Sequence, residues 1–480
     1  MKQLICGFLI FIAFNFSNLI AQNEQINLEK YKFYRQRFNQ YFIVVGKHPG
    51  ESFVIGNRNR YMGSKICFGQ QGVIWGYYLG VLSTEYALLM QQKDTLNAQK
   101  TLFEIDAAIN TYCNQMDKFE HIYGIEDKLD GCFIRENVPL SFLKDTNSQG
   151  ISHQKILNQN LDSSHIFLTD SGYFRGLPKG MPAYIDGLFQ VYAQKEMMSQ
   201  DEAYGIMMGF ALLAKCVPER QEIAKHLFEI ITLHIIGKNQ QNRCSNDGYI
   251  IKGPTCEIIS ESTGGNTSFF AYGIAAAAAA VTEKSIDNFI NKFSSKDYAN
   301  SLKQYSKNGK FRIPIGINNM YYIWKICGNG IPGNQEWNRS MACTLGAIGD
   351  SWGKNTEKHI IKNCYWTKGS KQHDWRTFYV SLWRFLHDKI GNDNERQAIN
   401  AELNTAPQYG PYNYKSATFP DNFSKGGWAY TYRYRATFSE QFEGSNLTGN
   451  FSGLDYMLMY NLYQLLYASS YADIPKYTVH

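Results

Sequence analysis

Helical periodicity is the feature that most constrains how this chain can fold. In the longer segments apolar residues recur every three to four positions, which is the spacing of one face of an α-helix. Residues 73–90 form a long, largely apolar example, and residues 96–123 form another, with Ile105, Ile109 and Tyr112 on one stripe. Such a chain buries helix faces against one another, so the pattern predicts an all-α protein.

Further helices follow from the same pattern. Ser199 and Glu202 have the spacing of a capping box, which predicts a helix that starts there. Alternation typical of strands is confined to 248–253 and 311–315. The other expected helices cover residues 28–42, 199–216, 219–236, 266–283, 318–327, 337–348, 377–390, 394–403 and 454–468.

Short and long connections alternate between these helices, which suggests stacked helical hairpins. Two rings of such hairpins make an (α/α)6-type toroid with few short strands, and the loops on one rim are then free to carry chemistry. The sequence has no repeat of fixed period and no Pro/Ser-rich linker, so we expect residues 22–480 to form a single domain.

The first 21 residues have the pattern of an export signal. Lys2 supplies a positive charge, Leu4 to Phe14 form an apolar run, and Ala21 is a small residue before the expected cleavage site. No later segment has 18 uninterrupted apolar residues, so no membrane span is expected. The signal predicts an exported protein, periplasmic or extracellular.

Charge and composition bear on the partner. The net charge of +6 is spread along the chain without a dense Lys/Arg block, which argues against a nucleic-acid partner. Aromatic residues make up 15% of the chain, with 33 Tyr and 8 Trp. These side chains have a flat apolar face and a polar edge that suit stacking on sugar rings, although they also fill contacts between helices.

Ten cysteines are present, and Cys6 lies in the expected signal, which leaves an odd number in the mature chain. Export permits disulfides. Cys244 and Cys256 flank a Gly/Pro-containing loop and are the predicted pair, whereas Cys113, Cys132 and other cysteines near apolar segments fit buried thiols. No cysteine or histidine spacing fits zinc, so neither a metal nor another cofactor is expected.

Five segments of the chain resemble secreted, mostly uncharacterised bacterial proteins of the six-hairpin glycosidase superfamily. They are YFIVVGKHPGESFVIGNRNR (41–60), WGYYLGVLSTEYALL (75–89), LDGCFIRENVP (129–139), EMMSQDEAYGIMMG (196–209) and GLDYMLMYNLYQLL (453–466). The resemblance implies an α/α toroid, a role connected with sugars and an exported location. It supplies no catalytic residues.

Glycoside hydrolysis needs two carboxyl groups that face each other across a cleft. Four carboxyl groups fall where a rim would place them, at loops or at helix starts: Glu136, Asp201, Asp374 and Asp455. Each has a structural alternative. A carboxylate in the first turn of a helix is stabilised by the helix dipole, which applies to Asp201 and Asp455, and Asp374 fits a helix N-cap.

The stretch LDGCFIRENVPL follows a predicted helix and places Arg135 beside Glu136. In an extended loop neighbouring side chains point to opposite sides, so these two cannot both face one ligand. Either Arg135 contacts the ligand and Glu136 fixes the loop, or the roles are reversed.

Aromatic and basic residues alternate in the segment 426–438. Its alternation puts Tyr430 on one side of an extended chain and both Arg433 and Arg435 on the other. Together with Trp75 and Trp428 these residues are the expected sugar contacts. The same residue types also suit a polysaccharide lyase, which needs a Tyr or His base and cations that neutralise a uronate.

The hypothesis from sequence is therefore an exported, monomeric, glycoside hydrolase-like protein that acts on a polysaccharide or oligosaccharide through rim carboxylates. The alternatives are a polysaccharide lyase that uses Tyr or His, and a non-catalytic glycan-binding or scaffold protein on the same fold. No GxSxG elbow, P-loop or HExxH is present, which argues against serine hydrolases, kinases and zincins.

Overall fold

The fold was analysed in a computed structural model. Its described residues are 24–36, 38–39, 42–45, 52–54, 57–58, 66–67, 71–134, 137–138, 149–150, 166–169, 172–175, 198–236, 251–254, 256, 258–260, 266–290, 335–350, 356–368, 371–407, 412–413 and 449–468.

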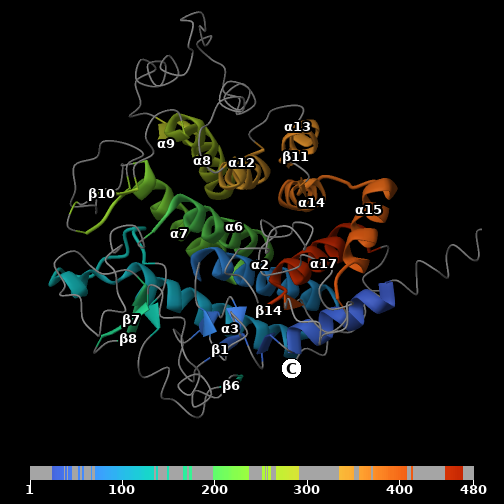
Figure 1. The fold of residues 1–480 in the computed structure, drawn as a ribbon, viewed down its shortest axis with the longest axis horizontal. Helices are drawn as coiled ribbons and strands as arrows, with labels where there is room; N and C mark the ends of the chain where they lie inside the picture. The colour runs from blue at the N-terminus through green and yellow to red at the C-terminus, as the bar shows by residue number, and fades with distance from the viewer. Residues whose placement is uncertain are drawn as a thin grey trace, which may run out of the picture.

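The described chain is predominantly helical (Figure 1). It starts with an N-terminal helix over residues 24–36. The helices that follow are α2 Gln71–Gln91, α3 Thr95–Thr111, α6 Gln200–Cys216, α7 Gln221–Ile235, α8 Asn266–Thr282, α9 Asp287–Ile290, α12 Gln335–Gly349, α13 Thr356–Asn363, α14 Arg376–Leu386, α15 Asp393–Asn404 and α17 Leu454–Tyr467. Single turns of other helix types cover Tyr112–Asp117 (π), Glu120–Tyr123 and Pro218–Arg220.

Strands of two to four residues pair in small antiparallel sheets. The sheet orders are β2-β1-β6, β10-β9, β11-β12, β13-β14-β3-β4 and β5-β8-β7. Their bounds are β1 Ile43–Val45, β2 Ser52–Val54, β3 Asn57–Arg58, β4 Ile66–Cys67, β5 Asn137–Val138, β6 Gln149–Gly150, β7 Ile166–Thr169, β8 Gly172–Arg175, β9 Ile251–Lys252, β10 Ile258–Ser260, β11 Tyr365–Lys368, β12 Lys371–Asp374, β13 Tyr412–Asn413 and β14 Gly449–Phe451.

Helices α2 and α6 approach each other closely because glycines line their contact. A Cβ atom added at Gly76 would lie 1.9 Å from the carbonyl oxygen of Gly205. Gly72 contacts Glu202, and Gly80 contacts Leu212. Residues further along α2 contact residues further along α6, so the two helices run in the same direction.

Three more helices share this direction. Leu458 of α17 contacts Gly80, and Asn461 donates hydrogen bonds to the Val81 carbonyl and Thr84 of α2, so α17 runs parallel to α2. The ring of Phe378 in α14 stacks on Tyr77. Ser340 of α12 bonds to Tyr379 of α14. Asp350, directly after α12, accepts a hydrogen bond from Trp383, which lies one turn after Tyr379, so α12 and α14 are parallel.

Helices α3, α7, α13, α15 and the N-terminal helix run the other way. Helix α8 does not, because Glu283 and Lys284 at its end pair with Lys225 and Glu229 of α7, so α8 is antiparallel to α7 and shares the direction of α6. In Figure 1 α2, α6, α12, α14 and α17 occupy the middle, and α3, α7, α13, α15 and the N-terminal helix surround them. Tyr467 at the end of α17 donates to Glu395 at the start of α15, which shows that this pair is antiparallel. Likewise Tyr78 of α2 bonds to Glu104 of α3, and Thr101 bonds to Glu85.

A buried ion cluster joins the N-terminal helix to α2 and α3. The guanidinium of Arg35 has no exposed surface and donates to Glu85 at 3.0 Å and to Glu104 at 2.7 Å. Tyr31 and Thr101 donate further hydrogen bonds to Glu85, at 2.6 and 2.9 Å. Because charges lose hydration when they are buried, this cluster depends on every partner being present.

Most of the helices expected from the sequence are confirmed to within a few residues. The exception is 96–123, where the α-helix ends at Thr111 and a π turn follows. The segments 311–315 and 318–327 lie outside the described residues. The buried apolar side chains form one cluster from Leu28 to Tyr463, and the single domain over residues 22–480 stays a prediction.

Cysteine pairing differs in part from the expectation. Cys343 of α12 is bonded to Cys364, which directly precedes β11, and the sequence did not suggest this pair. Cys256 is also in a disulfide. Cys244 lies outside the described residues, so the pairing of Cys244 with Cys256 stays a prediction. Cys113 and Cys216 are free thiols, and Cys132 and Cys216 are buried as expected.

We expect the substitution Gly76→Ala to destabilise the protein strongly, because the added methyl group meets the backbone of α6 rather than a flexible side chain. Overpacking of this kind costs about 3 kcal/mol or more. The control is Gly124→Ala: a Cβ there meets nothing within 4 Å, and only its φ of 68° is unfavourable, at about 1 kcal/mol. Denaturant unfolding measures both, and equal losses would contradict this helix contact.

We expect Arg35→Leu to lower the free energy of unfolding by about 3–5 kcal/mol, because it leaves Glu85 and Glu104 buried without their cation. The exposed pair of Lys32 and Glu29, with nitrogen and oxygen 3.6 Å apart, is the control, and Lys32→Leu should change stability by less than about 0.5 kcal/mol. A small loss for Arg35→Leu in urea unfolding would show that the cluster is not needed.

Candidate functional site

The candidate site lies at the end of the molecule where the parallel helices begin. Asp201 and Asp455 are the second residues of α6 and α17, and Asp374 is the last residue of β12, two positions before α14 starts. Helix α14 contacts both α6 and α17. Because these helices run in the same direction, three carboxylates from distant parts of the sequence lie at the same end.

At the start of α6 the two acidic residues have different neighbours. Ser199 donates a hydrogen bond of 2.5 Å to Asp201, which keeps part of its surface exposed. Glu202 is fully buried and accepts the backbone N–H of Val73 at 2.8 Å. The predicted capping box is therefore wrong: Ser199 is the N-cap residue, but Glu202 binds the start of α2 instead of its own helix.

Asp374 is held by the residue two positions after it. The guanidinium of Arg376 donates to both carboxylate oxygens, at 2.8 and 2.6 Å, and also lies 4.6 Å from the centre of the Tyr365 ring. The side chain of Asp374 is 41% exposed. The hairpin β11-β12 and the start of α14 thus present an oriented, accessible carboxylate.

Asp455 has no exposed surface, in contrast to Asp201 and Asp374. Its Oδ1 accepts the N–H of Tyr456 at 2.9 Å in the first turn of α17. Solvent reaches the other two carboxylates but not Asp455. Its position fits the structural alternative, a carboxylate that stabilises a helix N-terminus.

A buried acidic turn between α3 and residue 134 lies at the same end. Asp117 accepts the backbone N–H of Asp130 at 2.9 Å, the N–H of Gly131 at 3.0 Å and the hydroxyl of Tyr112 at 3.0 Å. Gly131 has a φ of 84° and lies against the carbonyl of Ile230, so a side chain has no room there. The LDGC stretch is therefore an ordered turn fixed by Asp117.

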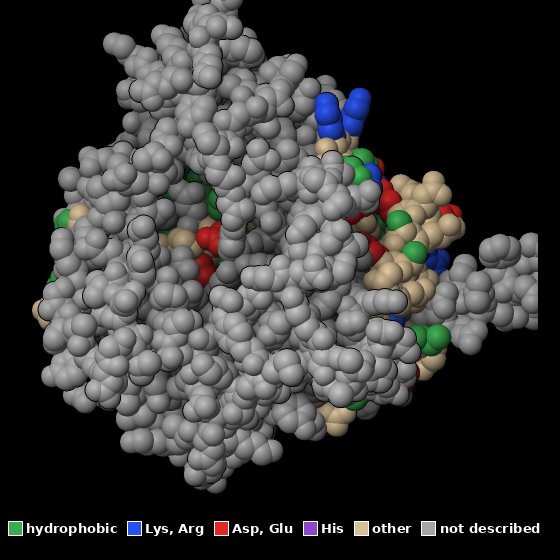
Figure 2. Space-filling view, in the orientation of Figure 1, with side chains coloured by type: hydrophobic (Ala, Val, Ile, Leu, Met, Phe, Trp, Pro, Cys, Tyr) green, Lys and Arg blue, Asp and Glu red, His purple; other side chains and the backbone are tan. Residues whose placement is uncertain are grey.

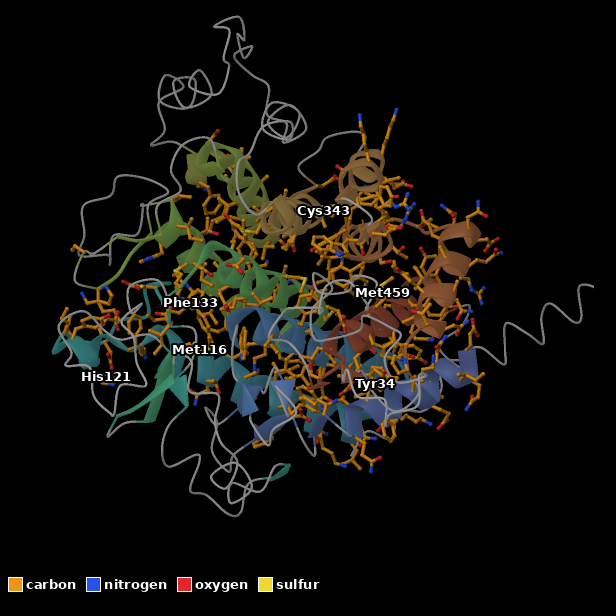
Figure 3. All side chains as sticks on the ribbon, in the orientation of Figure 1. Tyr34, Met116, His121, Phe133, Cys343 and Met459 are labelled. Carbon is orange, nitrogen blue, oxygen red and sulfur yellow. A yellow bond between two sulfur atoms is a disulfide. The ribbon has the colours of Figure 1, made fainter. Side chains whose placement is uncertain are left out.

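This turn continues into the core. Figure 3 shows Phe133 beside Met116, in agreement with the hydrogen bond from the Ile134 N–H to the Met116 carbonyl. His234 of α7 is buried, with its Nδ1 3.9 Å from Oδ1 of Asp130. The acidic turn thus links α3 to α7.

Burial is the main cause of the altered acidities in the turn. It raises the pKa of Asp117 well above its usual value, and the negative charge of Asp130 adds to this shift. Burial also raises the pKa of Glu120 to about 7, while backbone N–H groups that donate to its Oε2 act in the opposite direction. Sequence analysis did not single out either group, because both lie inside the segment 96–123 that was predicted to be one helix.

Several predicted site residues lie outside the described residues. They are Glu136, Arg135, Trp428, Tyr430, Arg433 and Arg435. Trp75 is described and has no exposed surface: its ring packs 5.7 Å from Tyr112 and 5.5 Å from Phe210, measured between centroids. Its position does not fit the predicted role as a sugar contact, because the apolar face that would stack on sugar is buried in the core.

The space-filling view adds one observation on access. Figure 2 shows a hollow in one face of the molecule, with acidic and hydrophobic side chains at its bottom.

In the described residues no group of three His, Cys, Asp or Glu side chains could hold a metal ion. Nor does any described helix have the length and apolar character to cross a membrane.

Comparisons with known proteins were negative. No protein-family model, no curated protein and no solved structure matches the chain. The resemblance to six-hairpin glycosidases therefore stays a hypothesis, and the site is interpreted from its own residues.

We expect stability to depend on pH through Glu120. Because its pKa in the folded protein is about 7, above its usual value of 4.5, the folded state binds the proton more tightly. The protonated carboxyl group therefore stabilises the folded state, and this contribution, on the order of 3 kcal/mol, is complete below about pH 4.5. It is lost as the pH rises from 4.5 through 7.

Glu120→Gln removes this titration but keeps an oxygen that can accept the same backbone hydrogen bonds. The difference in unfolding free energy between variant and parent, measured by urea unfolding at several pH values, should grow between pH 4.5 and 7 in favour of the variant. A flat difference for Glu120→Gln would refute the raised pKa.

Proposed function

We propose that this protein is exported and acts on a polysaccharide or oligosaccharide as a glycoside hydrolase-like enzyme. In this proposal the helices form an α/α toroid, and Asp201 and Asp374 on one rim are its reacting carboxyl groups. The observation that carries the proposal is the convergence of these two accessible carboxylates, from separate parts of the sequence, at the starts of helices that contact each other.

The helix contacts support the toroid. Helix α2 contacts α6, α6 contacts α12, α12 contacts α14, α14 contacts α17, and α17 returns to α2. This closed cycle consists of helices that run in one direction. Outer helices of opposite direction pack against it, with α3 on α2, α7 on α6 and α15 on α17. A cycle of parallel inner helices with antiparallel outer partners supports the proposed toroid of stacked hairpins.

The chemistry follows from what each carboxyl group can do. One group must protonate the glycosidic oxygen that leaves, and the other must activate water or attack the sugar. Arg376 fixes both oxygens of Asp374 and offsets its charge, which suits the ionised partner that acts on water or sugar. Asp201 is the other accessible carboxyl group and is therefore assigned to proton donation, with the Ser199 hydroxyl orienting it.

The test is a screen of the mature protein against polysaccharides that detects both new reducing ends and the absorbance of unsaturated uronates. We expect new reducing ends without that absorbance. Asp201→Asn and Asp374→Asn should each lower the rate by about 100-fold or more, because each removes a proton transfer or an attacking group. Asp455→Asn should affect stability more than rate.

The matched control is Asp393→Asn. Asp393 is also an acidic residue in the first turn of a helix, but α15 runs opposite to α17 and begins at the other end of the molecule. Full activity in Asp201→Asn and Asp374→Asn would reject this site. Absorbance from unsaturated products would indicate a lyase, and retention on glycans without any product would indicate a binding or scaffold protein.

A further inference from the structure

A cavity of about 620 Å³ lies at the opposite end of the parallel helices, away from the carboxylates. Its walls come from the last turns of α2, α6, α14 and α17. The volume is typical of pockets that hold small molecules, which range over roughly 300–1,000 Å³. It does not include any residue of the proposed hydrolytic site.

Aliphatic side chains form part of the walls. Ala87 and Met90 come from α2, and Leu465 and Leu466 from α17, with Pro218 after α6. Tyr86 and Phe385 are the aromatic members of this wall. Sugar sites rely on exposed aromatic faces and polar groups, whereas this lining favours a hydrocarbon body.

Residues 388–390, called the lip below, form one side of the cavity and carry an exposed isoleucine. Ile390 lines the cavity and is 90% exposed, and Met90 beside it is 43% exposed. The lip is held by Arg384, whose guanidinium donates to the Ile390 carbonyl and whose own carbonyl accepts the Lys389 N–H. Asp388 adopts a φ of 52°, an unfavourable conformation for a residue with a side chain.

The charges around the cavity are largely balanced. Lys215 is paired with Asp388 at 2.6 Å, and Arg384 is paired with Glu395 and Glu357. Glu219 accepts the Tyr86 hydroxyl at 2.9 Å. Burial, and after it this hydrogen bond, raises the pKa of Tyr86 to about 12. A charged ligand would therefore have to displace an existing partner.

We infer that this cavity binds an uncharged molecule with an aliphatic body that packs against the aliphatic part of the walls. The inference is independent of the proposed hydrolase function, because the two sites lie at opposite ends of the same helices. The site is a second, separate binding site of the protein.

The test uses N-phenylnaphthylamine, an uncharged dye whose fluorescence increases in apolar surroundings, with the mature protein. Octanol, octanoate and octylamine then compete for the site with the same chain and three different heads. We expect the dye to bind and octanol to displace it at roughly tenfold lower concentration than either charged competitor. No fluorescence increase, or displacement by octanoate or octylamine as effective as that by octanol, would overturn the inference.

Two variants test whether the dye binds in this cavity. Ala87→Trp should fill the cavity and weaken dye binding by about tenfold or more. Ile390→Asp should weaken it similarly by removing the apolar lip, and its exposed position makes a folding defect unexpected. The matched control is Ile361→Asp, an exposed isoleucine on α13 outside the cavity, which should bind the dye like the parent. Circular dichroism checks folding. Parent-like binding in Ile390→Asp, or equal loss in Ile361→Asp, would place the dye elsewhere and refute the site.

Discussion

The close approach of α2 and α6 sets the geometry of the rest of the described fold. Backbone meets backbone at Gly76 and Gly205, a distance that no side chain would allow. The approach brings the start of α2 within reach of the Glu202 carboxylate, which accepts the otherwise unsatisfied N–H of Val73. One carboxylate thus ties the starts of two helices together, and α17 and α14 then pack on α2 with the same direction.

A shared helix direction gives the molecule two chemically different ends. Each helix carries partial positive charge at its start and partial negative charge at its end. The acidic residues Asp201 and Asp455 lie at the starts, and the basic residues Lys215 and Arg384 lie in the last turns of α6 and α14. This electrostatic preference accounts for acidic residues at the rim without any catalysis, so accessibility has to separate functional from structural carboxylates.

The sequence predicts the helices well because their periodicity is local. Apolar spacing marks α2, α6 and α17, and Pro218 marks the break before α7. The sequence could not predict that Glu202 binds the start of α2, because a capping box and a bond to another helix are both compatible with the SQDE pattern. It also missed the pair of Cys343 and Cys364, 21 positions apart, since disulfide pairing depends on the packing of α12 against the segment before β11.

The candidate site shows the same division between local and tertiary information. Asp201 and Asp455 are alike in sequence terms, as second residues of apolar helices, and only packing shows that Asp455 is enclosed and Asp201 is not. Trp75 illustrates the same limit, because an aromatic residue in an apolar helix fits a core as well as a sugar platform. Asp374 differs in that its Arg376 partner lies two residues away, so the oriented carboxylate was visible in KQHDWRTF. What sequence could not supply was the parallel packing of α6 and α14, and it is this packing that places Asp374 and Asp201 at one end and makes a two-carboxylate reaction conceivable there.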